Sequence, residues 1–297
     1  MDASGTRQGA ILVLAGMAII GLIDNFVVEV AKYSGLWQFH FVRALMAIPM
    51  LIFIGLFWKQ ALLPQRYWAV GLRALLLGSA MLLYFGSIPS MPIALVIAGL
   101  FTSPVFVLIF SRVFFGQRVG SVRVSAVAIG FIGVLLVLNP LGEEFTWRLV
   151  LPIIGGALYA LNAIVSRRYC SEESTVAMLV GFFLVLGIMG AIGLVVLGRT
   201  ESADFLSRGW VEMGTPFLGW TLLQAAGSIL GVGLLTRAYQ TTETTYLVVF
   251  EYSLLLFASF WAFVLYGQTV GFMAALGMAF IVASGVIISW RSGSSTN

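Results

Sequence analysis

Long apolar segments, separated by short polar ones, run along almost the whole chain. Charged residues, glycines and prolines bound ten such segments. They cover residues 10–30, 37–57, 68–88, 92–112, 121–138, 147–168, 174–198, 215–238, 244–266 and 270–290. A helix that crosses a membrane needs about 20 mainly apolar residues, and none of these segments shows the strict alternation of a strand. The pattern therefore predicts an all-α polytopic membrane protein with ten transmembrane helices.

Composition points the same way. Of the 297 residues, 60% are hydrophobic and 9% are charged, whereas a soluble domain has about 25% charged residues. Ten helices of about 20 residues leave too little chain for a folded domain outside the membrane. The first apolar segment is long enough to span, so we expect the first helix there and not a cleaved leader.

The basic residues predict the orientation of the chain. An N-terminus in the cytoplasm places ten of the 16 lysines and arginines at the inner ends of the helices and four at the outer ends. The other two, Arg43 and Arg73, lie within predicted helices. Because positive charge gathers on the cytoplasmic side, both termini are expected inside. The basic residues are scattered singly, so the net charge of +4 does not indicate a nucleic-acid partner.

Short motifs recur in the same order in two halves, 1–146 and 147–297. The motif Gly-Gln-x-Val-Gly occurs at 116–120, where the central residue is Arg, and at 267–271, where it is Thr. Gly-Ser occurs at 78–79 and 227–228. Asn25 and Asn162 occupy matching points of the first and sixth helices. Each half has five helices, an odd number, so a duplicated second half must be inverted. Inverted repeats are typical of alternating-access carriers, whose site lies between the repeats.

Several of these residues carry a family resemblance. They are Arg43, the run from Tyr84 to Ser87, Ala94, Ser103-Pro104, Gly116-Gln117, 238–240 and 250–253. On them the chain resembles the drug/metabolite transporter superfamily, in its ten-helix branch with two EamA-type halves, and within it the exporters of aromatic and other amino acids. The resemblance implies a multi-pass carrier of the inner membrane. The chain departs from the family at Gln117 and Gln268, where many members have glutamate.

Charged residues inside predicted spans are candidate functional groups, because an unpaired charge in lipid costs several kcal/mol. Asp24 and Arg43 are expected at equal depth on adjacent helices, near the outer side, where they can form an ion pair. Two interpretations stay open: a structural pair that locks the two helices, and a gate or substrate contact. His40, one turn from Arg43, is expected at the membrane interface.

Arg73 and Glu251 are expected on the cytoplasmic side, at similar depths that allow them to pair across the two halves. Glu251 stands among aromatic residues, and a carboxylate in such surroundings can exchange a proton. The alternative is that Glu251 neutralises an arginine, Arg73 or Arg237.

Uncharged polar residues within the spans complete the candidate site. Asn25, Asn162 and Gln224 either bind a solute or hydrogen-bond neighbouring helices. Pro104 removes a helical hydrogen bond, and a broken helix at membrane depth is tolerated where it lines a cavity, so Ser103 and Pro104 are cavity candidates. Tyrosines are further cavity candidates, because their hydroxyls need hydrogen-bond partners when buried. The candidates are Tyr84, Tyr159, Tyr246 and Tyr252, together with Tyr239.

The chain has neither a catalytic cluster nor a phosphate-binding loop, so we expect no enzyme and no ATP-driven pump. With one cysteine and one histidine, neither a metal site nor another cofactor is expected. The predicted function is secondary export of amino acids, aromatic ones included, and related small metabolites by alternating access. The alternative is an importer or a multidrug-efflux carrier on the same fold. The expected partners are a small-molecule substrate, membrane lipid and protons.

Overall fold

A computed structural model describes residues 3–87, 96, 99–138, 150–202, 204–267 and 271–294. Within these ranges the regular secondary structure is helical throughout. The longer helices are α1 (Ala3–Asp24), α3 (Leu36–Phe57), α4 (Tyr67–Ser87), α6 (Ser103–Val113), α7 (Ser121–Leu138), α8 (Val150–Tyr169), α9 (Thr175–Leu197), α10 (Thr215–Thr241), α12 (Ser253–Tyr266) and α13 (Phe272–Ser294). Three short elements join them: α2 (Val27–Tyr33), α11 (Thr244–Leu247) and the 3-10 helix η4 (Val248–Tyr252).

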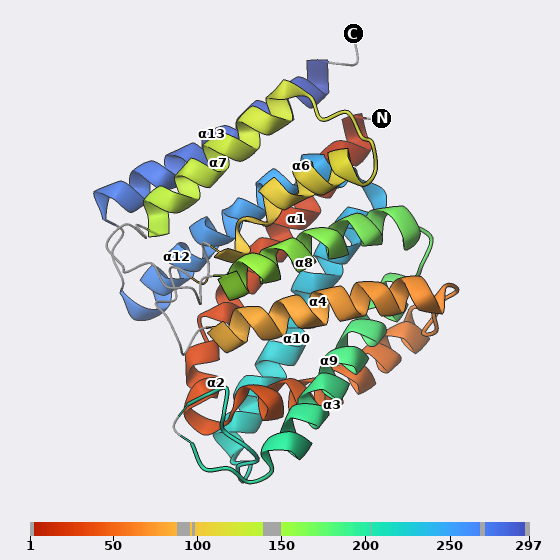
Figure 1. Cartoon of the computed structure of the whole chain (residues 1–297), viewed down its shortest axis with the longest axis vertical. Helices are drawn as coiled ribbons and strands as arrows, with labels where there is room; N and C mark the ends of the chain where they lie inside the picture. The colour runs from red at the N-terminus through yellow and green to blue at the C-terminus, as the bar shows by residue number, and fades with distance from the viewer. Residues whose placement is uncertain are drawn as a thin grey trace.

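Seven helical stretches of the described chain are long and apolar enough to cross a membrane. They are Thr6–Tyr33, Leu36–Phe57, Tyr67–Ser87, Val150–Tyr169, Thr175–Leu197, Thr215–Thr241 and Thr244–Tyr266. Shorter apolar helices lie at Ser103–Val113, Ser121–Val137 and Phe272–Ile287. All of these fall on the apolar segments of the sequence, and the start of α1 and the end of α13 lie on the same side of the bundle (Figure 1). The count of ten spans and the cytoplasmic termini stay predictions.

Two helices that the apolar pattern predicts as continuous are interrupted. The first stops at Asp24 and resumes as α2 at Val27. The Asn25 side chain donates a hydrogen bond to the Gly21 carbonyl at 2.7 Å and another to the Ala258 carbonyl of α12 at 3.4 Å. The ninth segment changes from α11 to η4 and then to α12. Hydropathy alone does not detect such breaks, because the residues on both sides of each break are equally apolar.

The fourth segment also begins a new helix within the protein. Phe101 and Thr102 form a turn, and α6 starts at Ser103 with Pro104 in its first turn. Proline is well placed there, because the first turn of a helix has no internal acceptor for its N–H groups. Gly156 of α8 allows the chain before the turn to come close, since a Cβ added there would lie 2.9 Å from the Leu100 carbonyl oxygen.

The helices pack in pairs around one centre (Figure 1). The main contacts are α1 with α10 and α12, α4 with α8 and α9, α3 with α9 and α10, and α6 with α8. The α7 and α13 helices pack along each other, and they lie together at one edge of the view (Figure 1). The remaining long helices therefore enclose the centre of the bundle.

Glycines set the closest approach of α7 and α13. A Cβ added to Gly133 would lie 2.7 Å from the Gly277 carbonyl oxygen, and one added to Gly277 would lie 2.5 Å from the Gly133 carbonyl oxygen. Both distances are shorter than a normal van der Waals contact, so each glycine makes room for the other backbone. Close backbone approach at small residues is a common means of helix association in membranes.

The first glycine of the repeated Gly-Gln motif has the same backbone conformation in both copies. Gly116 has a φ of 61° and Gly267 has a φ of 66°. Glycine reaches this left-handed region without the clash that a Cβ brings. Gly267 caps the end of α12, whereas Gly116 follows the Phe114 cap of α6 by two residues.

Candidate functional site: a central cavity

A cavity lies between the helices that surround the centre of the bundle. About 110 Å³ of it can hold the centres of water molecules, which is room for several waters, since about 10–15 Å³ of this measure holds one. Its walls come from α1, α3, α4, α6, α8, α9, α10, η4 and α12, and from the turn before α6. Neither α7 nor α13 contributes a lining residue.

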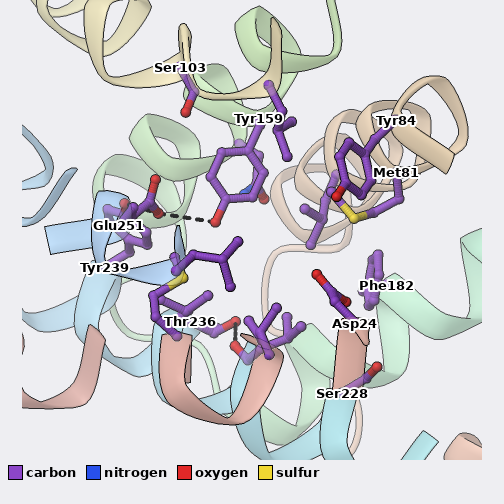
Figure 2. Close-up of a pocket in the computed structure, with 18 of the residues that line it drawn as sticks. Asp24, Met81, Tyr84, Ser103, Tyr159, Phe182, Ser228, Thr236, Tyr239 and Glu251 are labelled. Carbon is purple, nitrogen blue, oxygen red and sulfur yellow. Dashed lines mark hydrogen bonds between the residues drawn. The ribbon is translucent and has the colours of Figure 1, made fainter. Parts of the chain in front are cut away.

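Most of the predicted site residues meet in this cavity. Those that line it are Asp24, Arg43, Arg73, Tyr84, Ser103, Tyr159, Asn162, Gln224 and Glu251. They come from both halves of the chain and from segments more than 200 residues apart. Figure 2 shows Glu251 and Tyr239 on one side of the cavity, with Asp24, Phe182 and Ser228 on the other. The cavity therefore has a carboxylate on each of two sides, and many of its other lining residues are apolar.

Four predicted site residues lie elsewhere. Asn25 ties the break after α1 to α12 through its amide. Pro104 is buried at the start of α6 and acts only by beginning that helix. Tyr246 packs in a hydrophobic cluster, 5.4 Å from the Phe250 ring centre. Tyr252 packs edge-on against Phe101, at 6.0 Å between ring centres. These side chains support the walls and do not line the cavity.

Glu251 accepts hydrogen bonds from two tyrosines at one end of the cavity (Figure 2). The Tyr159 hydroxyl of α8 donates to Glu251 Oε1 at 3.0 Å, and the Tyr239 hydroxyl of α10 donates to the same oxygen. The 3-10 turn of η4 positions the carboxylate, and 2% of the residue is exposed. Its second oxygen, Oε2, has no partner among the described residues. Neither arginine named in the sequence analysis neutralises Glu251.

Arg73 is held by neutral oxygens. Its Nε donates to Ser166 Oγ at 3.0 Å, its Nη1 to the Met178 carbonyl at 3.2 Å and its Nη2 to Thr236 Oγ1 at 2.7 Å. These bonds join α4 to α8, α9 and α10. A buried guanidinium that is fixed on three sides serves as a permanent positive charge in the wall and has little freedom to follow a solute.

Arg43 is less completely bonded. Its Nη2 donates to His40 Nδ1 at 3.2 Å and its Nη1 to Ser228 Oγ at 3.5 Å, while the guanidinium carbon lies 4.9 Å from the Phe39 ring centre. Its Nε is buried without a hydrogen-bond partner. The prediction that His40 lies at the membrane interface is wrong, because the residue is fully buried beside Arg43.

Asp24 ends α1 and faces the cavity without a hydrogen-bond partner among the described residues (Figure 2). The expected ion pair with Arg43 is not formed, since no nitrogen of Arg43 comes within 4.0 Å of an Asp24 carboxylate oxygen. The reason is that Arg43 turns toward His40 and Ser228. The two charges face the same space but leave each other unpaired.

The sequence analysis missed several lining residues. Ser228 and Thr236 accept hydrogen bonds from the two buried arginines, and Phe182 and Met81 are apolar lining residues of the cavity. The signal for Ser228 was present, because it lies in the repeated Gly-Ser motif. Phe182 gave no signal, since α9 is apolar on all sides and periodicity cannot single out its inner face.

No group of three or more histidine, cysteine, aspartate or glutamate residues is arranged to hold a metal ion within the described ranges. The chemistry that the cavity offers is hydrogen bonding, charge and apolar contact. These are the interactions that bind a small organic molecule.

Comparisons of sequence and structure find known proteins that this chain resembles. A riboflavin transporter of Rhizobium johnstonii is 25% identical over 81% of this chain and 76% of its own. A pseudopaline exporter of Pseudomonas aeruginosa is 26% identical over 69% of each chain. An S-adenosylmethionine uptake transporter of Rickettsia bellii is 22% identical over 85% of each. One crystal structure matches 97% of each chain with a TM-score of 0.78 at 17% identity, which shows a shared fold.

The family comparison agrees with these relatives and with the membrane-capable helices. Together they show a multi-pass membrane protein related to small-molecule transporters. Residues 7–139 match the EamA-like transporter family, which confirms the resemblance of the chain to the drug/metabolite transporter superfamily.

Proposed function

We propose that the protein is a secondary carrier that moves a small organic solute across the inner membrane through its central cavity. The observation that carries the proposal is the cavity itself, in which charged and aromatic side chains from both halves meet away from lipid. Two lining residues each have a buried polar atom, Arg43 Nε and Asn162 Oδ1, without a hydrogen-bond partner in the described part of the chain. Buried polar groups are normally paired, so a solute or water is the natural partner for both atoms.

The packing supports two equivalent halves, 1–146 and 147–297, of five helices each. In chain order, α1 corresponds to α8, α3 to α9, α4 to α10, the segment of α6 to that of α12, and α7 to α13. Exchanging these equivalents turns the α1–α10 contact into the α8–α4 contact, and both are present. The α1–α12 and α8–α6 contacts are related in the same way, as are α3–α10 and α9–α4. Such symmetry favours an inverted repeat with alternating access between the halves.

The loop between α9 and α10 is hydrogen-bonded to the start of α3 at the predicted outer side. The backbone of Val211 exchanges two hydrogen bonds with the Gln38 side chain, at 2.9 and 2.7 Å, and Leu36 N donates to the Phe205 carbonyl at 2.8 Å. At the predicted cytoplasmic side, Glu173 accepts hydrogen bonds from the backbone of Gln65 and Arg66. In the proposed mechanism each set of contacts opens in turn while the other stays closed.

We propose amino acids, with aromatic ones included, as the solutes, and export as the direction. The cavity is lined by the aromatic residues Tyr84, Phe85, Phe101 and Phe182, and aromatic side chains offer large contact areas to an apolar group. The relatives carry names for both uptake and export of different solutes, so an importer or a multidrug-efflux carrier is the alternative.

Proteoliposomes test the function directly. Vesicles that contain the purified protein are loaded with an unlabelled amino acid, and uptake of the same labelled amino acid is followed without any ion gradient. A carrier gives transient accumulation by exchange, which empty liposomes do not. Competition by a panel of amino acids, riboflavin and cationic drugs then identifies the solute class. Absence of exchange for every compound would reject the proposed function.

A further inference from the structure

We propose that Asp24 and Arg43 form a two-part site for the charged groups of a zwitterionic solute. In this site Asp24 takes the ammonium group and Arg43 takes the carboxylate. The inference rests on the proposed function and assigns the orientation of the solute within the same cavity.

The first step is that both charges face the cavity with bonding capacity left over. Asp24 has no hydrogen-bond partner among the described side chains, and the Nε of Arg43 is buried and unpaired. They do not neutralise each other, because they lie beyond ion-pair distance. An unpaired charge is costly within the membrane, so the arrangement is completed by a ligand that carries both opposite charges.

The second step concerns the end of α1. The carbonyl groups at a helix C-terminus form the negative end of the helix dipole, where a cation is favoured and an anion is not. Asp24 is the last residue of α1 and lies at that end. Its neighbour Ile23 already uses its carbonyl to accept hydrogen bonds from Gln224 Nε2 at 2.6 Å and from Phe26 N at 3.0 Å. A carboxylate and a helix terminus together favour a cationic group over a neutral one.

The third step is the fixed position of Arg43. His40 and Ser228 hold the two terminal nitrogens, and the Phe39 and Phe183 rings lie 4.9 and 5.8 Å from the guanidinium carbon. Each terminal nitrogen makes one of these bonds and Nε makes none, so N–H groups remain, and arginine binds carboxylates through such groups. Arg73, by contrast, already donates from all three of its nitrogens to neutral oxygens.

The apolar part of the solute then points into the middle of the cavity. Met81, Tyr84 and Phe182 lie beside Asp24 there (Figure 2). The Tyr84 hydroxyl has no hydrogen-bond partner among the described residues and is available to the bound head group. The geometry thus favours an amphipathic zwitterion with one apolar side chain.

The test compares three probes that differ only in their charged groups: L-phenylalanine, 3-phenylpropionate, which lacks the ammonium group, and phenethylamine, which lacks the carboxylate. Binding to the full-length protein in lipid nanodiscs is measured by intrinsic tryptophan fluorescence. We expect the wild-type protein to bind phenylalanine at least about tenfold more tightly than either analogue, because each lost charge-assisted bond costs more than about 1.4 kcal/mol.

The variants assign each group separately. Asp24→Asn should remove the preference for phenylalanine over 3-phenylpropionate and keep the preference for phenylalanine over phenethylamine. Arg43→Gln should keep the first preference and remove the second. Glu29→Gln and Arg199→Gln make the same chemical changes outside the cavity and should keep both preferences. If the wild-type protein binds all three probes equally, or if the variants shift both preferences alike, the inference is wrong.

Two further readouts separate the possible failures. Binding is repeated with choline in place of sodium. If binding requires sodium but does not require the ammonium group of the probe, Asp24 holds a metal ion, and the proposal is overturned. If a variant does not fold, equal binding of the three probes by the wild-type protein would still overturn the inference. Loss of exchange for every solute in proteoliposomes rejects the carrier function, whereas exchange with unchanged preferences rejects only the assignment of Asp24 and Arg43.

Discussion

Arg123 and Glu243 form a bidentate ion pair that joins α7 to the residue before α11. The Arg123 Nη2 donates to Glu243 Oε2 at 2.7 Å, and its Nη1 contacts both Glu243 Oε1 and, at 2.6 Å, Thr245 Oγ1. The two residues belong to different predicted halves, at the end of the bundle that the charge distribution places in the cytoplasm. In the proposed cycle this pair must break whenever the inner side opens.

Removing one partner of this pair should weaken the closed state. Arg123→Gln and Glu243→Gln should each lower the melting temperature, and the double variant should lower it by less than their sum. The coupling should be about 1 kcal/mol, the upper part of the range for pairs in contact with solvent, because 26% and 27% of the two side chains are exposed. A cycle of four melting curves in detergent measures it. Arg118→Gln removes an exposed charge nearby and serves as the control, while additive effects would contradict the pairing.

The same pair predicts a pH dependence of stability. Although burial raises the pKa of Glu243, the hydrogen bonds from Arg123 and Thr245 outweigh it and hold that pKa below its ordinary value of 4.5. A depressed pKa contributes stability above the pKa of the unfolded chain and loses it as the pH falls through the folded value. The wild type should therefore lose more stability than Glu243→Gln between pH 6 and about pH 4. Parallel pH profiles of the two melting temperatures would contradict this.

Glu251 is the proposed proton-exchanging group. Glu251→Gln should fold, since the amide oxygen still accepts the Tyr159 and Tyr239 hydroxyl bonds, but its exchange rate should vary with pH far less than that of the wild type. Solute exchange in proteoliposomes between pH 5.5 and 8.5 measures the profile. Glu201→Gln, in the predicted outer loop, is the control. An unchanged profile for Glu251→Gln would remove the proton role.

The crossing of α7 and α13 should be intolerant of any side chain. Gly133→Ala should destabilise the protein by about 1–3 kcal/mol, as overpacking does elsewhere, because the added methyl group would strike the Gly277 backbone. Gly120→Ala is the matched control, since nothing lies within 4 Å of a Cβ at that position. Equal melting temperatures for the two variants would show that the helices can separate without loss.

Hydrophobic periodicity predicted the helices well because lipid imposes a length on every span. The same signal missed the breaks after Asp24 and within 248–252, where the backbone leaves the α-helical path but the side chains stay apolar. These breaks depend on tertiary partners, such as the bond from Asn25 to α12. No local pattern in the sequence contains that information.

The candidate site was predictable where a residue was unusual for its surroundings. Charges within apolar segments identified Asp24, Arg43, Arg73 and Glu251, all of which line the cavity. Their pairing was not predictable, because depth along a helix does not give the direction of a side chain. Tyr252, for example, stands next to Glu251 in the chain yet packs against Phe101 and does not itself line the cavity.

The cavity wall carries two carboxylates and two guanidinium groups, whose formal charges cancel. A zwitterion adds no net charge to this set, so its passage between the two faces displaces none across the membrane. A transmembrane voltage does work of about 2.3 kcal/mol per elementary charge per 100 mV, and it has nothing to act on in a solute of this kind. Any current that accompanies transport would therefore measure the number of protons that move with the solute in each transport cycle.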